Sequence, residues 1–402
     1  MSSHDSIVAH QLEVENFRGI ARAQLTLTPL TVLVGLNGSG KTAVLEALYL
    51  VGGHRSGRVE LSDRDPVGRS PILHVLRRHA YLEKEPRAPD AELLLGSEDR
   101  PEVKPDREPV EGGSPEADRS SKPTPKIHFA ELRIRSPRWL IRLGTDQARL
   151  RISSPPTFQL QDEWDRGRQA VLLDPSVGVE LEEALWFPRD PVDPLIQREP
   201  PMLMEGRDEW VAQRLREIYP GLSVSRFSGG AGGGERPRTV WAVINGQPVA
   251  IEQLGDGIQT AFRGLCLMAI MRSGLFLWDE PEDHQHPDAI RRLMETLADV
   301  LRNRPTLQVV IATQSREVLE ALREIGSREE EQEWVRKSLS VLFLILDAKD
   351  GRLYAERFTY EEFLAFEESG IDIRKFWLRR HIPRPRGIPS EVLERLPDLT
   401  RL

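Results

Sequence analysis

Short segments of alternating apolar and polar residues open the chain. Residues 12–15 and 25–27 alternate with a period of two, whereas residues 31–34 form a largely apolar run. A period of two predicts strands buried on one face, and a short apolar run predicts a strand buried on both faces. Residues 43–50 then carry apolar side chains at helical spacing. This part of the chain therefore predicts strands followed by a helix.

Apolar strands also alternate with helices in the C-terminal half. An Asn-Gly pair at 245–246, the favoured two-residue hairpin turn, separates the strand-like segments 239–244 and 248–251. The pattern further predicts helices at 209–218, 258–271, 289–301, 329–337 and from Tyr360, and strands at 275–278, 307–312, 339–346 and 353–358.

The middle of the chain is less regular. The pattern predicts a helix at 71–83, strands at 127–134, 139–143 and more weakly 150–152, short helices within 160–206, and a flexible glycine-rich loop at 228–234. Residues 85–126 are rich in Pro, Gly, Ser and acidic residues and have almost no aromatic side chains. Such a segment buries too little apolar surface to offset the entropy of ordering, so we expect a disordered insert.

Residues 35–42, Gly-Leu-Asn-Gly-Ser-Gly-Lys-Thr, lie between the predicted buried strand and the first predicted helix. Strand, glycine loop and helix are the context that a phosphate-binding loop requires. The glycines let backbone N–H groups turn inward around a polyphosphate, and the helix N-terminus adds the positive end of its dipole. Lys41 would reach the β- and γ-phosphates, and the Thr42 hydroxyl would ligate Mg²⁺. The other predicted nucleotide contacts in this phosphate loop are Asn37, Gly38, Ser39 and Gly40.

A second half-site follows the apolar strand at 275–278. Asp279, at the end of this strand, would accept a hydrogen bond from Mg²⁺-bound water or from Thr42. Glu280 would orient and deprotonate the attacking water. Arg18, in the turn between the first two predicted strands, is a further candidate for contact with the nucleotide, and a solvated turn arginine is equally consistent with its position.

The order of these segments distinguishes classes of NTPase. Asp279 lies far from the phosphate loop in sequence, whereas RecA-like and AAA+ sites place the two much closer together. It lies only one helix length after Gly255, Asp256 and Gly257, which open the predicted helix 258–271. ABC-type ATPases have this arrangement, and the helix start of one protomer binds the γ-phosphate held by another through its exposed N–H groups. We therefore expect an ATP-dependent dimer.

Composition narrows the class of partner. The 402-residue chain has a formal net charge of −8, so the whole molecule is not a basic nucleic-acid binder, although a local patch stays open. Its one cysteine, Cys266, excludes a disulfide framework or a cysteine-based zinc site within one chain, which fits a reducing cytosol. The start lacks a signal-peptide core and no apolar run reaches membrane-spanning length, so we expect a cytoplasmic protein with no membrane partner.

Three segments resemble the RecF/SMC-like ABC ATPases: Leu-Glu-Val-Glu-Asn-Phe-Arg-Gly at 12–19, the phosphate loop, and Asp-Glu-Pro-Glu-Asp-His-Gln-His-Pro at 279–287. The most similar branch is that of the OLD-type ATPases of bacterial ATP-binding proteins and phage-defence systems. The resemblance covers residues 10–55 and 239–320 well and extends more loosely to 339–376. It implies an ABC-type α/β P-loop NTPase head, with a mixed sheet flanked by helices and an insertion subdomain, that binds ATP and Mg²⁺.

Two positions depart from the family pattern. The signature serine has no counterpart in the signature segment, residues 254–257, so γ-phosphate capture would rest on backbone N–H groups. Gln314 stands in place of the switch histidine. Glutamine can hydrogen-bond a γ-phosphate but cannot take up and release a proton as histidine does, so we expect slow catalysis. Gln285 stands where the family pattern has a leucine. For the flanking His284 and His286, a structural role is favoured over a metal-binding pair.

The resemblance also divides the chain. We expect an N-terminal ATPase lobe at 1–84, the disordered insert at 85–126, a helical insertion subdomain at 127–238, a C-terminal ATPase lobe at 239–338, and strands, a helix and a basic tail at 339–402. The expected function is an ATPase that acts as a nucleotide-dependent dimerisation switch. Its expected partners are a second copy or a higher oligomer, a protein effector encoded nearby, and DNA, in phage defence or DNA repair.

Two alternatives stay open: an OLD-like nuclease that acts on DNA, and a slow or inactive ATP-binding scaffold. A Toprim nuclease needs an early Glu and an Asp-x-Asp pair, whereas Asp347 and Asp350 follow a different spacing. A long-armed SMC machine is disfavoured because the chain has no heptad run or Cys-x-x-Cys hook. A GTPase is disfavoured because no Asn-Lys-x-Asp motif is present. The basic tail at 374–386 would contact DNA backbone, although in an acidic protein a solvated end or a contact with a partner is favoured.

Overall fold

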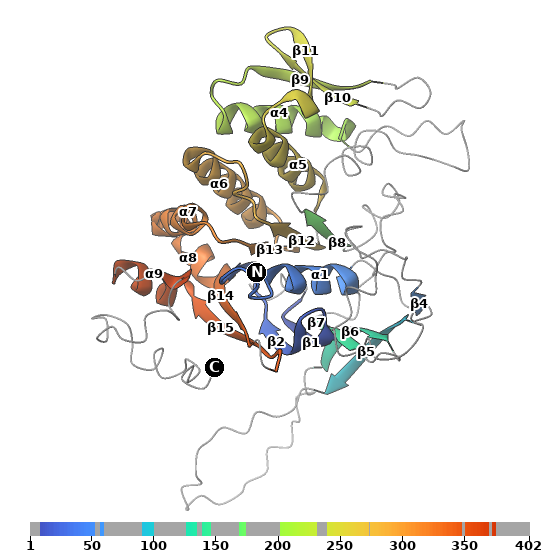
Figure 1. Ribbon diagram of the computed structural model, residues 1–402. Helices are drawn as coiled ribbons and strands as arrows, with labels where there is room; N and C mark the ends of the chain where they lie inside the picture. The colour runs from blue at the N-terminus through green and yellow to red at the C-terminus, as the bar shows by residue number, and fades with distance from the viewer. Residues whose placement is uncertain are drawn as a thin grey trace, which may run out of the picture.

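The computed structural model describes residues 9–52, 57–59, 91–99, 126–134, 139–145, 169–173, 202–230, 239–272, 274–347, 350–369 and 372–374. Within these ranges the strands form two six-stranded sheets and one three-stranded sheet (Figure 1). None of the helices in the same ranges is both long and apolar enough to cross a membrane.

The first six-stranded sheet contains the strands with the most apolar sequences. Its order is β15-β14-β3-β13-β12-β8, and all neighbours are parallel except β14 with β15. These strands are β3 (Leu30–Val34), β8 (Gln169–Leu173), β12 (Gly274–Asp279), β13 (Leu307–Ala312), β14 (Leu339–Leu346) and β15 (Leu353–Thr359). Every residue of β3, β12 and β13 is buried, as expected for parallel strands covered on both faces.

Helices cover both faces of this sheet (Figure 1). The helices on one face are α5 (Asp256–Ile270), α6 (Pro287–Asn303), α7 (Arg316–Ser327), α8 (Glu329–Ser338) and α9 (Tyr360–Glu368). On the other face, α1 (Lys41–Gly52) lies between this sheet and the second six-stranded sheet. Because side chains alternate along a strand, Val32 joins the first hydrophobic core and Leu33 joins the second.

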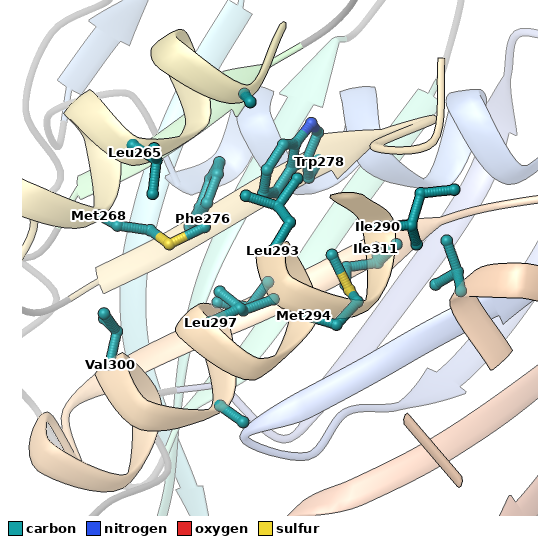
Figure 2. Packing of buried hydrophobic residues seen from close by; sticks show 14 of the residues in the cluster. Leu265, Met268, Phe276, Trp278, Ile290, Leu293, Met294, Leu297, Val300 and Ile311 are labelled. Atoms are coloured by element: carbon teal, nitrogen blue, oxygen red, sulfur yellow. The ribbon is translucent and has the colours of Figure 1, made fainter. Parts of the chain in front are cut away.

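The centre of the larger core fixes α5 on β12. Figure 2 shows Leu265 of α5 and Leu293 of α6 beside Phe276 and Trp278 of β12. The two aromatic rings stack with their centroids 5.2 Å apart. A Cβ atom added at Gly264 of α5 would lie 2.4 Å from the Trp278 ring, so only glycine permits this approach of helix and strand.

The second six-stranded sheet is antiparallel throughout, with the order β2-β1-β7-β6-β5-β4. Its strands are β1 (Gln11–Phe17), β2 (Ile20–Thr26), β4 (Gly57–Val59), β5 (Ala91–Asp99), β6 (Lys126–Ile134) and β7 (Trp139–Thr145). The prediction of a disordered insert at 85–126 is therefore wrong for Ala91–Asp99. This strand contains the apolar run Leu93-Leu94-Leu95, and its backbone pairs along its whole length with β6.

The three-stranded sheet, β11-β10-β9, lies beside α4 (Arg207–Ile218) at one end of the molecule (Figure 1). Its strands are β9 (Val224–Gly230), β10 (Thr239–Ile244) and β11 (Gln247–Ala250), and short 3₁₀ turns lie at Met204–Gly206 and Ile251–Gln253. The predicted hairpin is confirmed: Asn245 and Gly246 have φ of 51° and 78°, the left-handed pair that a two-residue turn requires. The predicted flexible loop at 228–234 is wrong for 228–230, because those residues pair with β10.

Other sequence predictions have mixed outcomes. The predicted helices at 209–218, 258–271, 289–301, 329–337 and from Tyr360 are confirmed to within a few residues. Within 160–206 the structure has a strand, β8, which borders β12; its five residues give too short a pattern to identify alone. The sequence analysis missed α7, although Ser315 caps it and its apolar residues have helical spacing. The predicted helix at 71–83, the strand at 150–152 and the tail beyond Arg374 lie outside the described residues.

Candidate active site

The phosphate loop connects the end of β3 to the start of α1. Gly38 and Gly40 have φ of 79° and 92°, in the left-handed region that favours glycine. At Gly35 an added Cβ atom would lie 2.6 Å from the carbonyl oxygen of Leu344, so the loop also needs a glycine where it leaves β3. Residues 36–38 at the tip are exposed. The glycines therefore shape a loop whose tip is open to solvent.

Lys41 lies at the base of this loop, with 6% of its surface exposed. Its Nζ atom donates hydrogen bonds to the carbonyl oxygens of Gly35 at 2.9 Å and Leu36 at 3.1 Å. Burial lowers the pKa of Lys41, and the carboxylates of Asp279 and Glu280 oppose that shift. The ammonium group is thus held inside the loop and faces the acidic residues at the end of β12.

The two predicted half-sites meet at the same edge of the sheet. The Thr42 hydroxyl donates a hydrogen bond of 2.9 Å to Asp279 Oδ2, across a separation of 237 positions in sequence. The strands β3, β13 and β12 are parallel neighbours, so their carboxyl ends come together. A hydroxyl and a carboxylate in contact offer the hard oxygen ligands that Mg²⁺ prefers, so these side chains fit the predicted metal role.

Glu280 contacts Gln314, as expected if the two residues act together. The Gln314 side-chain amide donates to Glu280 Oε1 at 3.1 Å, and the Glu280 N–H donates to the carbonyl oxygen of Ala312 at 2.8 Å. Glu280 has φ of 50°, a left-handed conformation that costs a non-glycine residue on the order of 1–3 kcal/mol. Strain of this kind often marks functional positions, and the carboxylate of this strained residue accepts the hydrogen bond from Gln314.

Sequence reasoning missed Glu282, which organises the switch turn, Thr313–Ser315. Its Oε1 atom accepts hydrogen bonds from the Thr313 hydroxyl at 2.7 Å, the Gln314 N–H at 3.0 Å and the Ser315 N–H at 3.1 Å. Burial raises the pKa of Glu282, and the hydrogen bonds from Thr313 and Gln314 act in the opposite direction. In the sequence, the position of Glu282 two residues after Glu280 was the one indication of a role in the site. Its contacts become evident only from the fold.

Arg374 was also missed as part of the site. Its Nη1 atom donates to the carbonyl oxygen of Gln314 at 2.7 Å, and its Nε and Nη2 atoms donate to Asp372 at 2.9 and 2.7 Å. The Asp372 carboxylate raises the pKa of Arg374, which therefore stays cationic. The residue that the sequence analysis placed at the start of a basic tail is anchored on the switch turn.

Arg18 packs against the helix that follows the phosphate loop. Its Nη2 atom donates to Glu46 Oε1 at 2.6 Å, and Nε contacts the other carboxylate oxygen. Glu46 belongs to α1 and only 1% of its side chain is exposed. The structure thus pairs Arg18 with α1. This differs from both sequence-based alternatives, a contact with the nucleotide and a solvated turn arginine. Its contact with nucleotide stays a prediction.

The signature segment packs against the loop that follows β12. The Gly257 carbonyl oxygen accepts a 2.5 Å hydrogen bond from the Gln285 side-chain amide and a 3.0 Å bond from the Tyr219 hydroxyl, which also contacts the Gln285 side-chain oxygen. A Cβ atom at Gly257 would lie 2.4 Å from the backbone oxygen of His284. Gly255 and Asp256, at the N-terminus of α5, are exposed. The packing explains the glycine at 257 and the glutamine at 285.

The two histidines beside Gln285 have different surroundings. His286 is the N-cap of α6, and its Nδ1 atom accepts a hydrogen bond of 3.2 Å from the Asp288 N–H. His284 Nε2 lies 3.5 Å from a carboxylate oxygen of Asp283. Within the described ranges, no group of three or more His, Cys, Asp or Glu side chains has an arrangement that would hold a metal ion by itself. His286 therefore has a structural role at the start of α6.

Two parts of the chain match known family models. Residues 9–65 match a model described as "AAA ATPase domain", and residues 226–320 match one described as "AAA domain, putative AbiEii toxin, Type IV TA system". The first match includes the phosphate loop. The second includes the signature segment, the acidic end of β12 and the switch turn.

Curated relatives match a short stretch of the chain. The chain is 51% identical over 55 residues to "DNA replication and repair protein RecF" of Shewanella sp. (strain W3-18-1), and equally to that of Shewanella putrefaciens. The stretch is 13% of this chain and spans only 15% of the relatives' length. Their activity as whole proteins therefore does not transfer to this chain directly.

Solved structures of SMC heads resemble the chain over most of its length. One is the Smc head domain of Pyrococcus furiosus bound to the C-terminal domain of ScpA, with a TM-score of 0.49 and 13% identity over 90% of this chain and 98% of that one. Another is the SMC head domain from Thermotoga maritima, with a TM-score of 0.39 and 13% identity over 88% and 99%. Both TM-scores lie below 0.5, where a likeness of folds carries no weight.

The family models support an ATPase of the AAA type, and the short identity shows a segment similar to RecF. A protein of this type binds ATP, typically with Mg²⁺. The matches do not distinguish the OLD-type branch from its relatives.

Proposed function

We propose that the protein binds Mg·ATP at the phosphate loop and hydrolyses it, with Glu280 as the general base. The hydrogen bond from Thr42 to Asp279 is the observation that carries the proposal, because it joins the start of α1 to the acidic end of β12. The same two side chains would hold Mg²⁺, which when bound neutralises charge on the β- and γ-phosphates. Hydrolysis of ATP needs both half-sites, and in this fold they are in direct contact.

The other residues of the site would have separate roles in phosphoryl transfer. The backbone N–H groups of residues 37–40 and the Lys41 ammonium would bind the phosphates. Glu280 would accept a proton from water as the water oxygen bonds to the γ-phosphorus and the bond to the ADP oxygen breaks. The Gln314 amide, which contacts Glu280, would orient the water or the γ-phosphate without exchanging a proton, so slow turnover follows.

The second part of the proposal is an ATP-dependent dimer. Gly255 and Asp256 are exposed at the start of α5, where the first backbone N–H groups of a helix lack partners within it. This end of α5 would bind the γ-phosphate held by the phosphate loop of a second copy, so that ATP joins the two protomers. The chain order of phosphate loop, signature segment and acidic strand supports this arrangement.

Dimerisation would then act as a switch for a partner. The RecF relatives are named for DNA replication and repair. The description of the family model that matches residues 226–320 names an AAA domain and a type IV toxin–antitoxin system. Either a protein effector encoded nearby or DNA would respond to the ATP-bound dimer. A switch of this kind suits phage defence or DNA repair.

The test replaces Glu280 with glutamine and compares ATP turnover and oligomeric state with and without Mg·ATP. The amide keeps the size of the side chain but accepts no proton, so turnover should fall by about 100-fold or more. Glu280→Gln should accumulate as an ATP-bound dimer in size-exclusion chromatography with light scattering. The matched control is Glu320→Gln, which removes a carboxylate of α7 that pairs with Arg316 at the surface.

The outcomes separate the parts of the proposal. Wild-type turnover in Glu280→Gln would overturn the assignment of the base. A protein that stays monomeric with bound ATP would overturn the dimer. Tight binding of ATP without measurable hydrolysis by the wild type would favour an ATP-binding scaffold.

A further inference from the structure

All three polar groups of Gln314 are held by other residues. Its N–H donates to Glu282 at 3.0 Å, its carbonyl oxygen accepts from Arg374 at 2.7 Å, and its side-chain amide donates to Glu280 at 3.1 Å. The side chain itself is exposed. An exposed glutamine ordinarily samples several rotamers, whereas here the backbone on both sides of its Cα atom is fixed. The direction of its side chain is thus determined by residues outside the switch turn.

Glu282 fixes the switch turn from the side of β12. One carboxylate oxygen accepts three hydrogen bonds from three consecutive residues, Thr313–Ser315. Within the described part of the chain, its other oxygen is buried and has no hydrogen-bond partner. A buried acceptor left unpaired is destabilising, so Glu282 holds the turn at a cost in stability. Glu282 also belongs to the loop that carries Glu280. It therefore links Glu280 directly to Gln314 of the switch turn.

Arg374 fixes the same turn from the other side. Its guanidinium group uses Nε and Nη2 on Asp372 and Nη1 on the Gln314 carbonyl oxygen. The planar fork of arginine suits this task, because one group binds a carboxylate and a carbonyl in fixed relative positions. Lysine has a single charged nitrogen and cannot reproduce both sets of contacts at once.

We infer that Glu282 and Arg374 are positioning residues that hold Gln314 against Glu280 and so set the rate of the hydrolysis step. The inference rests on the proposed ATPase function and adds two residues to its machinery. Neither residue touches the reacting atoms in this role. Each acts through Gln314, so loss of either should lower kcat for ATP and leave nucleotide affinity nearly unchanged.

The experiment compares Glu282→Leu with Glu282→Gln in the full chain. Glutamine keeps a carbonyl oxygen that accepts the three hydrogen bonds, whereas leucine has none. We expect Glu282→Leu to lower kcat by about 10- to 100-fold, the range for a displaced catalytic group, and Glu282→Gln to stay within about threefold of wild type. The dissociation constant for a fluorescent ATP analogue should change by less than about threefold in both variants.

Arg374→Met provides a second variant in case Glu282→Leu does not fold. Arg374→Lys should have the same low kcat as Arg374→Met, because lysine cannot make both sets of contacts. The matched controls are Arg316→Met and Glu320→Leu, which break an exposed i,i+4 pair on α7 and should keep wild-type kcat. A general loss of structure would be detected by thermal unfolding. The most selective readout is a double mutant with Glu280→Gln. If Glu282 acts by holding Gln314 against Glu280, the second substitution should lower the residual rate by less than about twofold.

The results distinguish this inference from the proposed function. If the wild type has no ATP turnover, or if Glu280→Gln hydrolyses ATP as fast as the wild type, the proposed function and the positioning roles are both wrong. If Glu280→Gln is slow but folded Glu282→Leu and Arg374→Met keep wild-type kcat, only the positioning roles are wrong. Additive losses in the double mutant, or a nucleotide affinity that falls in parallel with kcat, would also overturn the positioning roles.

Discussion

The side-chain amide of Gln285 donates a hydrogen bond of 2.5 Å to the carbonyl oxygen of Gly257. This contact joins the loop that follows Glu280 to the first turn of α5, and Tyr219, the C-cap of α4, contacts both partners. A leucine, as the resemblance would predict at 285, has no group that could make this bond. The signature segment and the loop that follows β12 are therefore joined within one protomer.

Replacing Gln285 with leucine should destabilise the protein by about 1–2 kcal/mol, because the Gly257 carbonyl and the Tyr219 hydroxyl lose a half-buried hydrogen-bond partner. Denaturant unfolding of Gln285→Leu, Tyr219→Phe and the double mutant would measure this. Because the two side chains contact each other, the double mutant should lose less than the sum of the single losses. Strict additivity would show that they do not interact.

Removing the Thr42 hydroxyl should weaken the response to Mg²⁺ more than it weakens folding. Thr42→Val keeps the shape of the side chain but loses the bond to Asp279 and the predicted ligand atom. We expect the Mg²⁺ concentration for half-maximal ATP turnover to rise roughly tenfold or more, and Thr42→Ser to remain close to wild type. An unchanged Mg²⁺ dependence in Thr42→Val would contradict the metal role of this residue.

Glu282 should make the stability of the protein depend on pH. Burial raises its pKa above the usual value of 4.5, with the hydrogen bond from Thr313 as the largest opposing effect. Its stabilising contribution is complete below the unfolded pKa and is lost as the pH rises through the higher folded pKa. The free energy of unfolding of wild type relative to Glu282→Gln should thus fall over the pH range that begins at the usual value of 4.5. Denaturant titrations across this range measure it, and a constant or rising difference would refute the shift.

Gly264 should not tolerate a larger side chain. An alanine Cβ at this position would meet the Trp278 ring at 2.4 Å, in a fully buried part of the core. We expect Gly264→Ala to destabilise the protein by about 1–3 kcal/mol, the usual cost of overpacking, despite the better helix propensity of alanine. The control is Gly221→Ala, where an added Cβ meets no atom within 4 Å. Equal unfolding midpoints for the two variants would show that the core adapts without cost.

Several features of the protein followed from its sequence because each depends on residues close together in the chain. The phosphate loop needs only a strand, its glycines, Lys41 and Thr42 in order, and the Asn245-Gly246 turn needs only two residues with left-handed backbone. The apolar run before Asp279 likewise identified a buried strand. In these segments, local backbone preference and hydrophobic periodicity are enough to predict the structure.

The motifs predicted the contact between Thr42 and Asp279, but the tertiary structure alone decided the other contacts between distant segments. Strand order brings Thr42 to Asp279, and packing brings Glu282 and Arg374 to the switch turn and Arg18 to Glu46. It also makes strands of residues 91–99 and 169–173, whose partners lie elsewhere in the chain. The physical reason is that a hydrogen bond between distant residues leaves no periodic pattern in the sequence. Its partners are set by the order of strands and by the faces that the helices cover.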